Sequence, residues 1–269
     1  MDVLCQMGAI GLEEAKAVRL MNRMERKYVA SADRLDELLE RVADHYFVQQ
    51  VDGNREAPYR TLYFDTDDLA MYTMHHNGKL NRQKLRVRTY RSTDTTFFEI
   101  KNKDNKGRTS KMRLPMDVQM FDHPEEVPEV REFVVRNTPF ALCVGIRGGM
   151  RLQACLENRF GRITLVDRGM KERVTIDRGI AFHNRVTGWD ADLGGLLVIE
   201  VKHEAGTPMS EMERTLHEMH VQTQRMSKYC IGTALTNTSA KKNRFKPMML
   251  YIDNLKSSIV NHQSLTINL

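Results

Sequence analysis

Apolar and charged residues alternate with a period of two in several segments of the chain. The clearest cases are KLRVR at 84–88 and FEIKNK at 98–103, which a polar segment at 91–95 separates. Successive side chains of a strand point to opposite faces of a sheet. The pattern therefore predicts a hairpin of two strands, each with one apolar and one charged face.

Further segments extend this pattern. Strands are predicted at 23–30, 59–65, 107–115, 151–160, 162–168, 172–179 and 195–204. Helices are predicted at 31–46, where four apolar residues recur at helical spacing, and at 67–76, 123–137, 209–220 and 227–235. Strands and helices do not alternate regularly, so a doubly wound parallel sheet is disfavoured. We expect an α+β fold, mainly β, in which an antiparallel sheet closes into a barrel with helices packed outside.

The charged faces of these strands allow two interpretations. They can meet water, as one face of an open antiparallel sheet often does. Alternatively, if helices cover the apolar faces, the charged faces line an enclosed interior. Like charges such as those of Arg86 and Arg88 are expensive to bury unless a ligand neutralises them. The second interpretation therefore requires a polyanionic ligand, and alternation alone leaves both open.

Composition narrows the class of protein. The 269 residues are 41% hydrophobic and carry a formal net charge of +6, which favours an anionic partner: nucleic acid, anionic lipid or a phosphorylated small molecule. The sequence has no apolar run long enough to span a membrane and no signal-peptide pattern at its N-terminus. Four scattered cysteines argue against a zinc site and fit a reducing compartment. We therefore expect a cytoplasmic protein without a membrane span.

Seven short motifs occur in a fixed order: ERKYV, YFDT, RVRTY, FEIK, RVTID, VIEVK and SKYCIG. In this order they resemble the polyphosphate polymerase domain of the vacuolar transporter chaperone family, which belongs to the triphosphate tunnel metalloenzymes. The resemblance covers residues 22–236. It divides the chain into a loosely attached leader at 1–21, the tunnel domain at 22–236 and a basic C-terminal tail at 237–269.

The resemblance implies a tunnel that binds a triphosphate chain. Position by position, the family's phosphate-binding residues correspond to Lys27, Arg86, Arg88, Lys101, Arg159, Arg173 and Lys228. All of these except Arg159 are also implied to take part in catalysis. Glu200 corresponds to the metal-coordinating glutamate, and Glu25 and Glu99 are further candidate ligands for Mn²⁺ or Mg²⁺. The implied partners are ATP and pyrophosphate or polyphosphate, and no nucleic acid is expected.

One position departs from the wider superfamily, whose first strand carries Glu-x-Glu-x-Lys. Arg23 stands here in place of the first glutamate. This favours ATP-dependent polyphosphate synthesis over hydrolysis of a triphosphate, because hydrolysis relies on acidic residues that hold metals around a water. A triphosphatase and a non-catalytic polyanion-binding module remain the alternatives. No P-loop, GxGxxG or protein-kinase motif is present.

Overall fold

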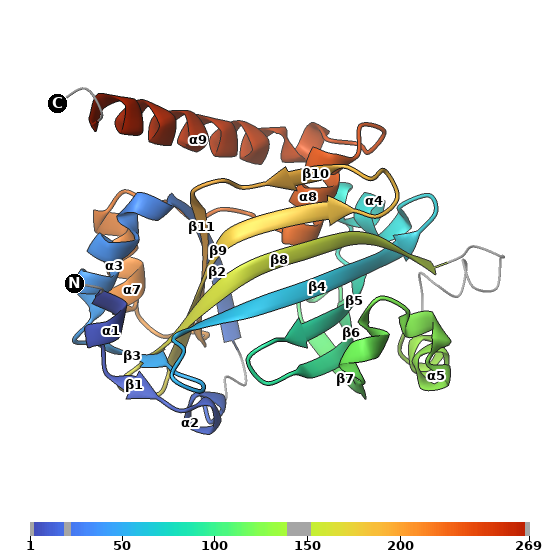
Figure 1. The fold of residues 1–269 in the computed structure, drawn as a ribbon, viewed down its shortest axis with the longest axis horizontal. Coiled ribbons are helices and arrows are strands. Elements are labelled where there is room, and N and C mark those ends of the chain that lie inside the picture. Colours follow the sequence, from blue (N-terminus) through green and yellow to red (C-terminus); the bar gives the residue numbers. More distant parts are fainter. Residues whose placement is uncertain (1–2, 19–22, 139–151, 267–269) are drawn as a thin grey trace.

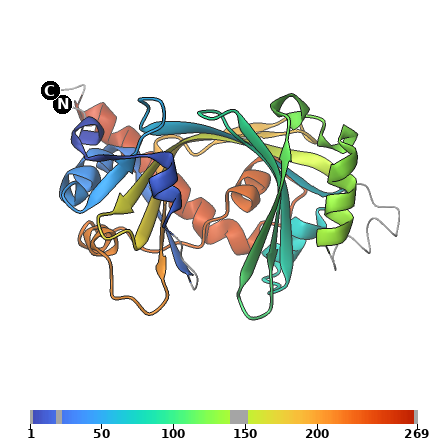
Figure 2. The ribbon, with the colours of Figure 1, turned by 90° about the horizontal axis from the view of Figure 1, so that it is seen from below.

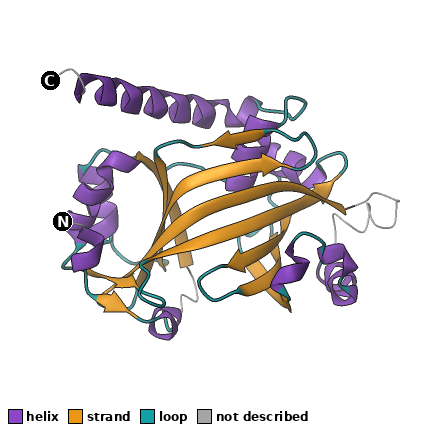
Figure 3. Cartoon of the chain, in the orientation of Figure 1, coloured by secondary structure: helices purple, strands orange, loops and turns teal. Residues whose placement is uncertain are grey.

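The structure, a computed structural model, describes residues 3–18, 23–138 and 152–266. Its centre is one large, mainly antiparallel sheet, with helices around it (Figures 1 and 3). The main strands are β2 (Arg23–Ser31), β4 (Glu56–Thr66), β5 (Arg82–Tyr90), β6 (Thr95–Lys103), β7 (Thr109–Met116), β8 (Leu152–Asp167), β9 (Glu172–Asn184) and β11 (Leu196–Glu204). Short strands β1 (Ala9–Ile10), β3 (Tyr46–Gln49) and β10 (Asp190–Asp192) attach beside this path.

The α+β, mainly β prediction is confirmed, but the prediction of a closed barrel is wrong. The strands follow the order β2-β11-β9-β8-β4-β5-β6-β7, and in the described part of the chain β2 and β7 do not pair with each other. The sheet instead curves, so that its two end regions stand opposite each other across the concave side (Figure 2). In the part of the chain that the structure describes, no strand joins the two edges. The N-terminal part of α8 (Lys228–Thr236) lies on the concave side, where Lys228 pairs with Asp177 of β9.

The convex face carries the apolar residues of the alternating segments, as predicted. At one end, β9, β11 and β2 pack on α3 (Leu35–Val42) and α7 (Glu211–Glu218). Helix α3 buries Leu35, Leu38, Leu39 and Val42, which lie on one face of the helix. At the other end, the apolar side chains of β5 and β6 pack on α5 (Pro128–Asn137) and the 3₁₀ turn η2 (Val118–Phe121). The charged side chains of the same strands therefore face the concave side.

A bulge in β9 changes which residues face the concave side. Arg159 of β8 pairs with Ala181 of β9, but Gly161 pairs with Arg178, so β9 holds one extra residue. Gly179 has a φ of +58°, in the left-handed region that glycine tolerates. Beyond the bulge β9 places Ile180 and Phe182 in the apolar cluster that contains α8. The bulge thus divides the concave side into a charged region and a region that holds this helix.

The two flanks of the predicted tunnel domain pack on the sheet. In the leader, the structure describes α1 (Val3–Gln6), β1 and α2 (Leu12–Lys16); Met7 and Ala15 are buried, and β1 pairs with β3. In the tail, it describes η4 (Asn243–Phe245) and α9 (Lys246–Thr266), which runs along the outside of the molecule (Figure 1). Residues 1–2, 19–21 and 267–269 of these flanks lie outside the described residues.

The sequence predictions about membrane-spanning helices and about the cysteines can be compared with the described residues. None of their helices is both long and apolar enough to cross a bilayer. Cys155 and Cys230 are buried thiols, while Cys143 lies outside the described residues.

Candidate functional site

The concave side of β5, β6 and β7 carries rows of cations. Lys101 of β6 stands directly between Lys84 of β5 and Lys111 of β7, and one step along the strands Glu99 stands between Arg86 and Arg113. Side chains directly opposite each other on one face of an antiparallel pair are in contact range. The first row therefore places three ammonium groups side by side.

Glu99 neutralises part of this charge. Its side chain is fully buried, and its Oε2 accepts hydrogen bonds from Arg86 Nε and Nη2 at 2.7 and 2.6 Å. Its Oε1 pairs with Lys111 and lies 3.0 Å from Arg113 Nε. Burial raises the pKa of this carboxyl, but the neighbouring cations, Arg86 first, lower it below its usual range. Glu99 is therefore an anionic centre that holds cations of all three strands.

Arg88 and Lys101 have no such partner. Among the described residues, no carboxylate lies within 4.0 Å of either side chain. Arg88 is buried, and its Nε donates to Thr61 Oγ1 at 3.1 Å. The pKa of Lys101 is held well below its usual value, by Arg86 first, then by burial and by Arg88. These two side chains can each accept an anionic ligand without breaking an ion pair.

A second charged cluster lies on β2 and β11. Glu200 pairs with Lys27 at 3.4 Å and with Lys202, and Lys27 also pairs with Glu25. Burial raises the pKa of Glu25, but the charges of Lys27 and Lys202 lower it to about 2. Arg173 of β9 stands beside Lys202 in the register. Burial first, and then neighbouring cations that include Arg173, hold the pKa of Lys202 well below its usual value. This cluster therefore contains two carboxylates and three cations on one face of the sheet.

Asp177 connects the sheet to α8. Its carboxylate accepts two hydrogen bonds from Arg162, at 2.5 and 2.7 Å, and pairs with Lys228 at the start of α8. The side chain of Ser227 caps the helix by accepting from Cys230 N and also accepts from Lys84 Nζ at 2.9 Å. The N-terminus of α8 is thereby fixed between β9 and β5.

The two clusters influence each other across the concave side. The charge of Lys202 on β11 lowers the pKa of Lys101 on β6. In the opposite direction, the charge of Lys101 lowers the pKa of Glu25 on β2. Lys27 likewise lowers the pKa of Lys84. The curvature of the open sheet therefore brings charges from its two ends into electrostatic range, although the end strands do not pair.

Most of the predicted site residues come together on this concave face: Lys27, Arg86, Arg88, Lys101, Arg173, Lys228, Glu25, Glu99 and Glu200. Arg159 does not. Its side chain is 66% exposed and pairs with Glu157, which also pairs with Arg60 and Arg185 on the opposite face of the sheet.

Sequence reasoning missed three concave-side residues: Lys84, Arg162 and Asp177. The same alternation was present for all three: Lys84 begins KLRVR, Asp177 ends RVTID, and Arg162 precedes the apolar Ile163. Arg162 and Arg159 are three residues apart and so lie on opposite faces of β8.

The family resemblance implies a divalent cation, so we ask which of these carboxylates could bind one. The described residues contain no cluster of three or more His, Cys, Asp or Glu side chains arranged to hold a metal. Both oxygens of Glu99 and both oxygens of Glu200 are paired with cations, and Glu25 pairs with Lys27 through Oε1. The side chains of Glu200 and Glu25 are 18% and 35% exposed, whereas that of Glu99 is fully buried. Mg²⁺ is commonly bound by one or two carboxylates plus substrate phosphates. Glu200 and Glu25 fit a cation that is shared with a bound phosphate chain.

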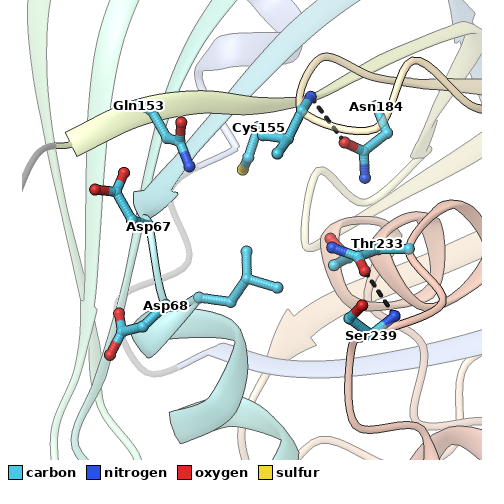
Figure 4. Close-up of a pocket in the computed structure, with 10 residues that line it drawn as sticks. Asp67, Asp68, Gln153, Cys155, Asn184, Thr233 and Ser239 are labelled. Atoms are coloured by element: carbon cyan, nitrogen blue, oxygen red, sulfur yellow. Dashed lines mark hydrogen bonds between the residues drawn. The ribbon is translucent and has the colours of Figure 1, made fainter.

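A separate cavity of about 230 Å³ lies outside this face, between the start of β8, the start of α4 (Ala70–His76) and the C-terminal half of α8. Figure 4 shows Asp67, Asp68 and Gln153 on one side and Thr233 and Ser239 on the other. No lysine or arginine is among the described residues that line it. Its polar atoms are carboxylates, amides, hydroxyls and a thiol, so it does not share the chemistry of the concave face.

The fold and the site define a class of protein: a curved antiparallel sheet whose concave face is basic. Known proteins can now be compared with this chain. The sequence pattern of the VTC domain matches residues 22–237, which is most of the chain. The chain therefore belongs to the VTC domain family, as its motifs predicted. No curated protein matches the chain.

Comparison with solved structures finds similarity at low sequence identity. A proposed adenylyl cyclase from Hippeastrum, described as having a dominant triphosphatase activity, is 15% identical with a TM-score of 0.51, covering 81% of this chain and 98% of its own. A proposed adenylate cyclase from Vibrio parahaemolyticus is 11% identical with a TM-score of 0.45, covering 79% and 99%. At such identities the first comparison shows the fold alone.

Proposed function

We propose that the chain transfers the γ-phosphoryl group of ATP to the end of an inorganic polyphosphate chain, with Mn²⁺ or Mg²⁺ as cofactor. The observation that carries the proposal is Lys101, a largely buried cation that lies among Arg86, Arg88 and Lys111 without a carboxylate partner among the described residues. Concentrated buried charge of one sign is costly, and a phosphate chain would neutralise it. Membership of the VTC domain family supports the same substrate class.

The chemistry requires positioning and charge neutralisation more than covalent participation of the protein. An oxygen of the chain's terminal phosphate attacks the γ-phosphorus, the bond to the β–γ bridging oxygen breaks, and ADP leaves with the electron pair. Arg86 and Arg88 are two residues apart on one strand, a separation of about 6.6 Å, and their planar guanidinium groups suit successive phosphates. Glu200 and Glu25 would hold the metal, which neutralises phosphate oxygens when it is bound.

Hydrolysis of a triphosphate is the second candidate function. It is favoured by the fold shared with the Hippeastrum protein, which is described as mainly a triphosphatase. Arg23 counts against it, because that position lacks the acid that would help to hold metals around a water. Arg23→Glu should raise phosphate release relative to chain growth if this position separates the two reactions. A binding module without turnover is the third possibility.

One assay separates the three functions. The purified protein is incubated with ATP, Mn²⁺ or Mg²⁺ and a pyrophosphate primer, and products are resolved by gel electrophoresis. The proposal predicts long phosphate chains and stoichiometric ADP. Accumulation of free phosphate without chains would replace it with the triphosphatase function. Salt-sensitive binding of polyphosphate with no turnover would leave only the binding module.

A further inference from the structure

The cations of the concave face continue beyond the strands onto the C-terminal segment. Arg82 and Lys103 form a cross-strand pair one step beyond the pair Lys84–Lys101. Arg82 Nη1 donates to the carbonyl of Lys79 at 2.9 Å, which places that lysine at the strand's entry. The row of cations therefore reaches the end of β5 and the turn before it.

The segment before α9 is fixed against this end of the sheet. Tyr72 Oη of α4 donates to the carbonyl of Lys241 at 2.7 Å, and Arg244 N lies 3.4 Å from His76 Nε2. The guanidinium of Arg244 lies against Gly78, where a methyl group would collide with it. The tail thus presents its cations from a fixed backbone.

His75 of α4 shows that the two groups of cations are close together. Its ring lies 6.2 Å from the ring of Phe245, the residue after Arg244. Burial first, and then the charges of Lys84, Arg82 and Lys103, lower the pKa of His75 to about 3. One imidazole is therefore in range of the concave-face cations and in contact with the tail.

The outer basic surface, as we define it, consists of Lys79, Arg82, Lys103, Lys241, Lys242 and Arg244. Each of these side chains is exposed or half-buried, and none pairs with a carboxylate within 4.0 Å among the described residues. Unpaired cations that continue a buried row match a ligand that is itself a long row of anions.

We propose that the outer basic surface binds the part of a polyphosphate chain that extends beyond the concave face. The inference rests on the proposed function for the identity of the ligand. It assigns to the tail a role in distinguishing long phosphate chains from short ones. A tripolyphosphate contacts only the concave face, whereas a long chain also contacts the outer basic surface. Membrane lipid is disfavoured because the surface continues a row on a concave sheet.

The experiment compares two probes on the intact chain, tripolyphosphate and a long-chain polyphosphate, by titration at fixed ionic strength. The triple variant Lys241→Ala, Lys242→Ala, Arg244→Ala should bind the long chain about tenfold more weakly, since each exposed charge contributes modestly. Its affinity for tripolyphosphate should not change. A matched triple variant elsewhere, Arg131→Ala, Arg136→Ala, Lys171→Ala, removes three exposed charges and should leave both affinities unchanged.

A second measurement uses the unaltered protein and so does not depend on how the variant folds. Lysine acetylation followed by mass spectrometry should show protection of Lys79, Lys103 and Lys241 by the long chain but not by tripolyphosphate. Equal loss of affinity in the two triple variants, or lysines that stay reactive under the long chain, would overturn the inference. If the protein makes no chains but the tail variant selectively loses long-chain binding, the surface stands and the polymerase proposal falls.

Discussion

Lys101 is largely buried among like charges, so replacing it should affect the stability of the fold and the binding of phosphate in opposite directions. Lys101→Met should raise the melting temperature by about 2–4 °C, because a repelled cation becomes an apolar side chain of similar length. The same change should weaken tripolyphosphate binding about ten- to a hundredfold, the range for a lost charge-assisted hydrogen bond. Thermal unfolding and titration calorimetry measure the two effects.

Arg86→Met is the matched control for this prediction. Arg86 is also buried on the concave face but pairs with Glu99, so its loss leaves a buried carboxylate less well paired. We expect it to destabilise the fold by about 3–5 kcal/mol while also weakening nucleotide binding. If Lys101→Met were as destabilising as Arg86→Met, Lys101 would be a structural cation rather than a ligand-binding one.

Glu200 tests the metal site. Glu200→Gln keeps the size of the side chain but removes a charged oxygen donor, so metal-dependent turnover should fall at least about a hundredfold. Binding of metal-free tripolyphosphate should be kept or improved, because Lys27 and Lys202 lose an anionic competitor. Kinetics with Mn²⁺ and calorimetry with chelator measure the two. Unchanged turnover would remove Glu200 from the metal site.

The sequence predicted correctly on which face a residue lies where alternation and motif agreed. Arg86, Arg88 and Lys101 satisfy both, and the structure places them on one face. Arg159 rested on the family resemblance alone, and its spacing from Arg162 puts the two side chains on opposite faces of β8. Local pattern therefore identifies a face more reliably than a brief motif identifies a residue.

At the scale of elements, the strands, the hairpin of β5 and β6, and the covering of their apolar faces followed from residue patterns. The open edges of the sheet did not: closure was predicted and is wrong, because pairing of β2 with β7 would join segments far apart in the chain, and no local pattern decides whether they meet. The bulge in β9 was equally hidden, since Gly179 reads as a simple strand end in the sequence. The element that lies on the concave side, α8, was predicted as a helix but not placed.

Asp177 supplies the ion pair between β9 and Lys228 of α8, and its replacement tests whether a bound anion can compensate for the lost carboxylate. Asp177→Asn leaves Arg162 and Lys228 without their carboxylate, so we expect a loss of about 3–5 kcal/mol in unfolding free energy. Tripolyphosphate should then raise the melting temperature of the variant more than that of the original chain. Asp190→Asn, at an exposed pair with His183, is the control and should change neither value.

At the scale of the whole molecule, the fold gathers an excess of cations in one region of the concave side of a curved sheet. Its apolar contacts lie on the convex side and around α8. The convex clusters supply the burial that stabilises the sheet, while Glu99, Asp177 and Glu200 hold the cations at fixed positions. Fixed positions cost no further reorganisation when a ligand arrives. Because the cations lie close together, the binding of a polyanion should also change the protonation of the lysines on the concave face.

This coupling gives a prediction for the intact protein. Burial, together with the charge of Arg86, lowers the pKa of Lys111 to about 7, and the pKa of Lys101 is also far below its usual value. At pH 8 Lys111 is therefore mostly neutral, and a bound anion stabilises the charged forms of both lysines and raises both pKa values. Tripolyphosphate binding at pH 8 should therefore take up protons, an effect that shrinks as the pH falls below 7. Calorimetry in two buffers of different ionisation enthalpy measures the uptake, which should be smaller in Lys111→Met. Proton release, or heats that do not depend on the buffer, would show that these lysines are already charged before the ligand binds.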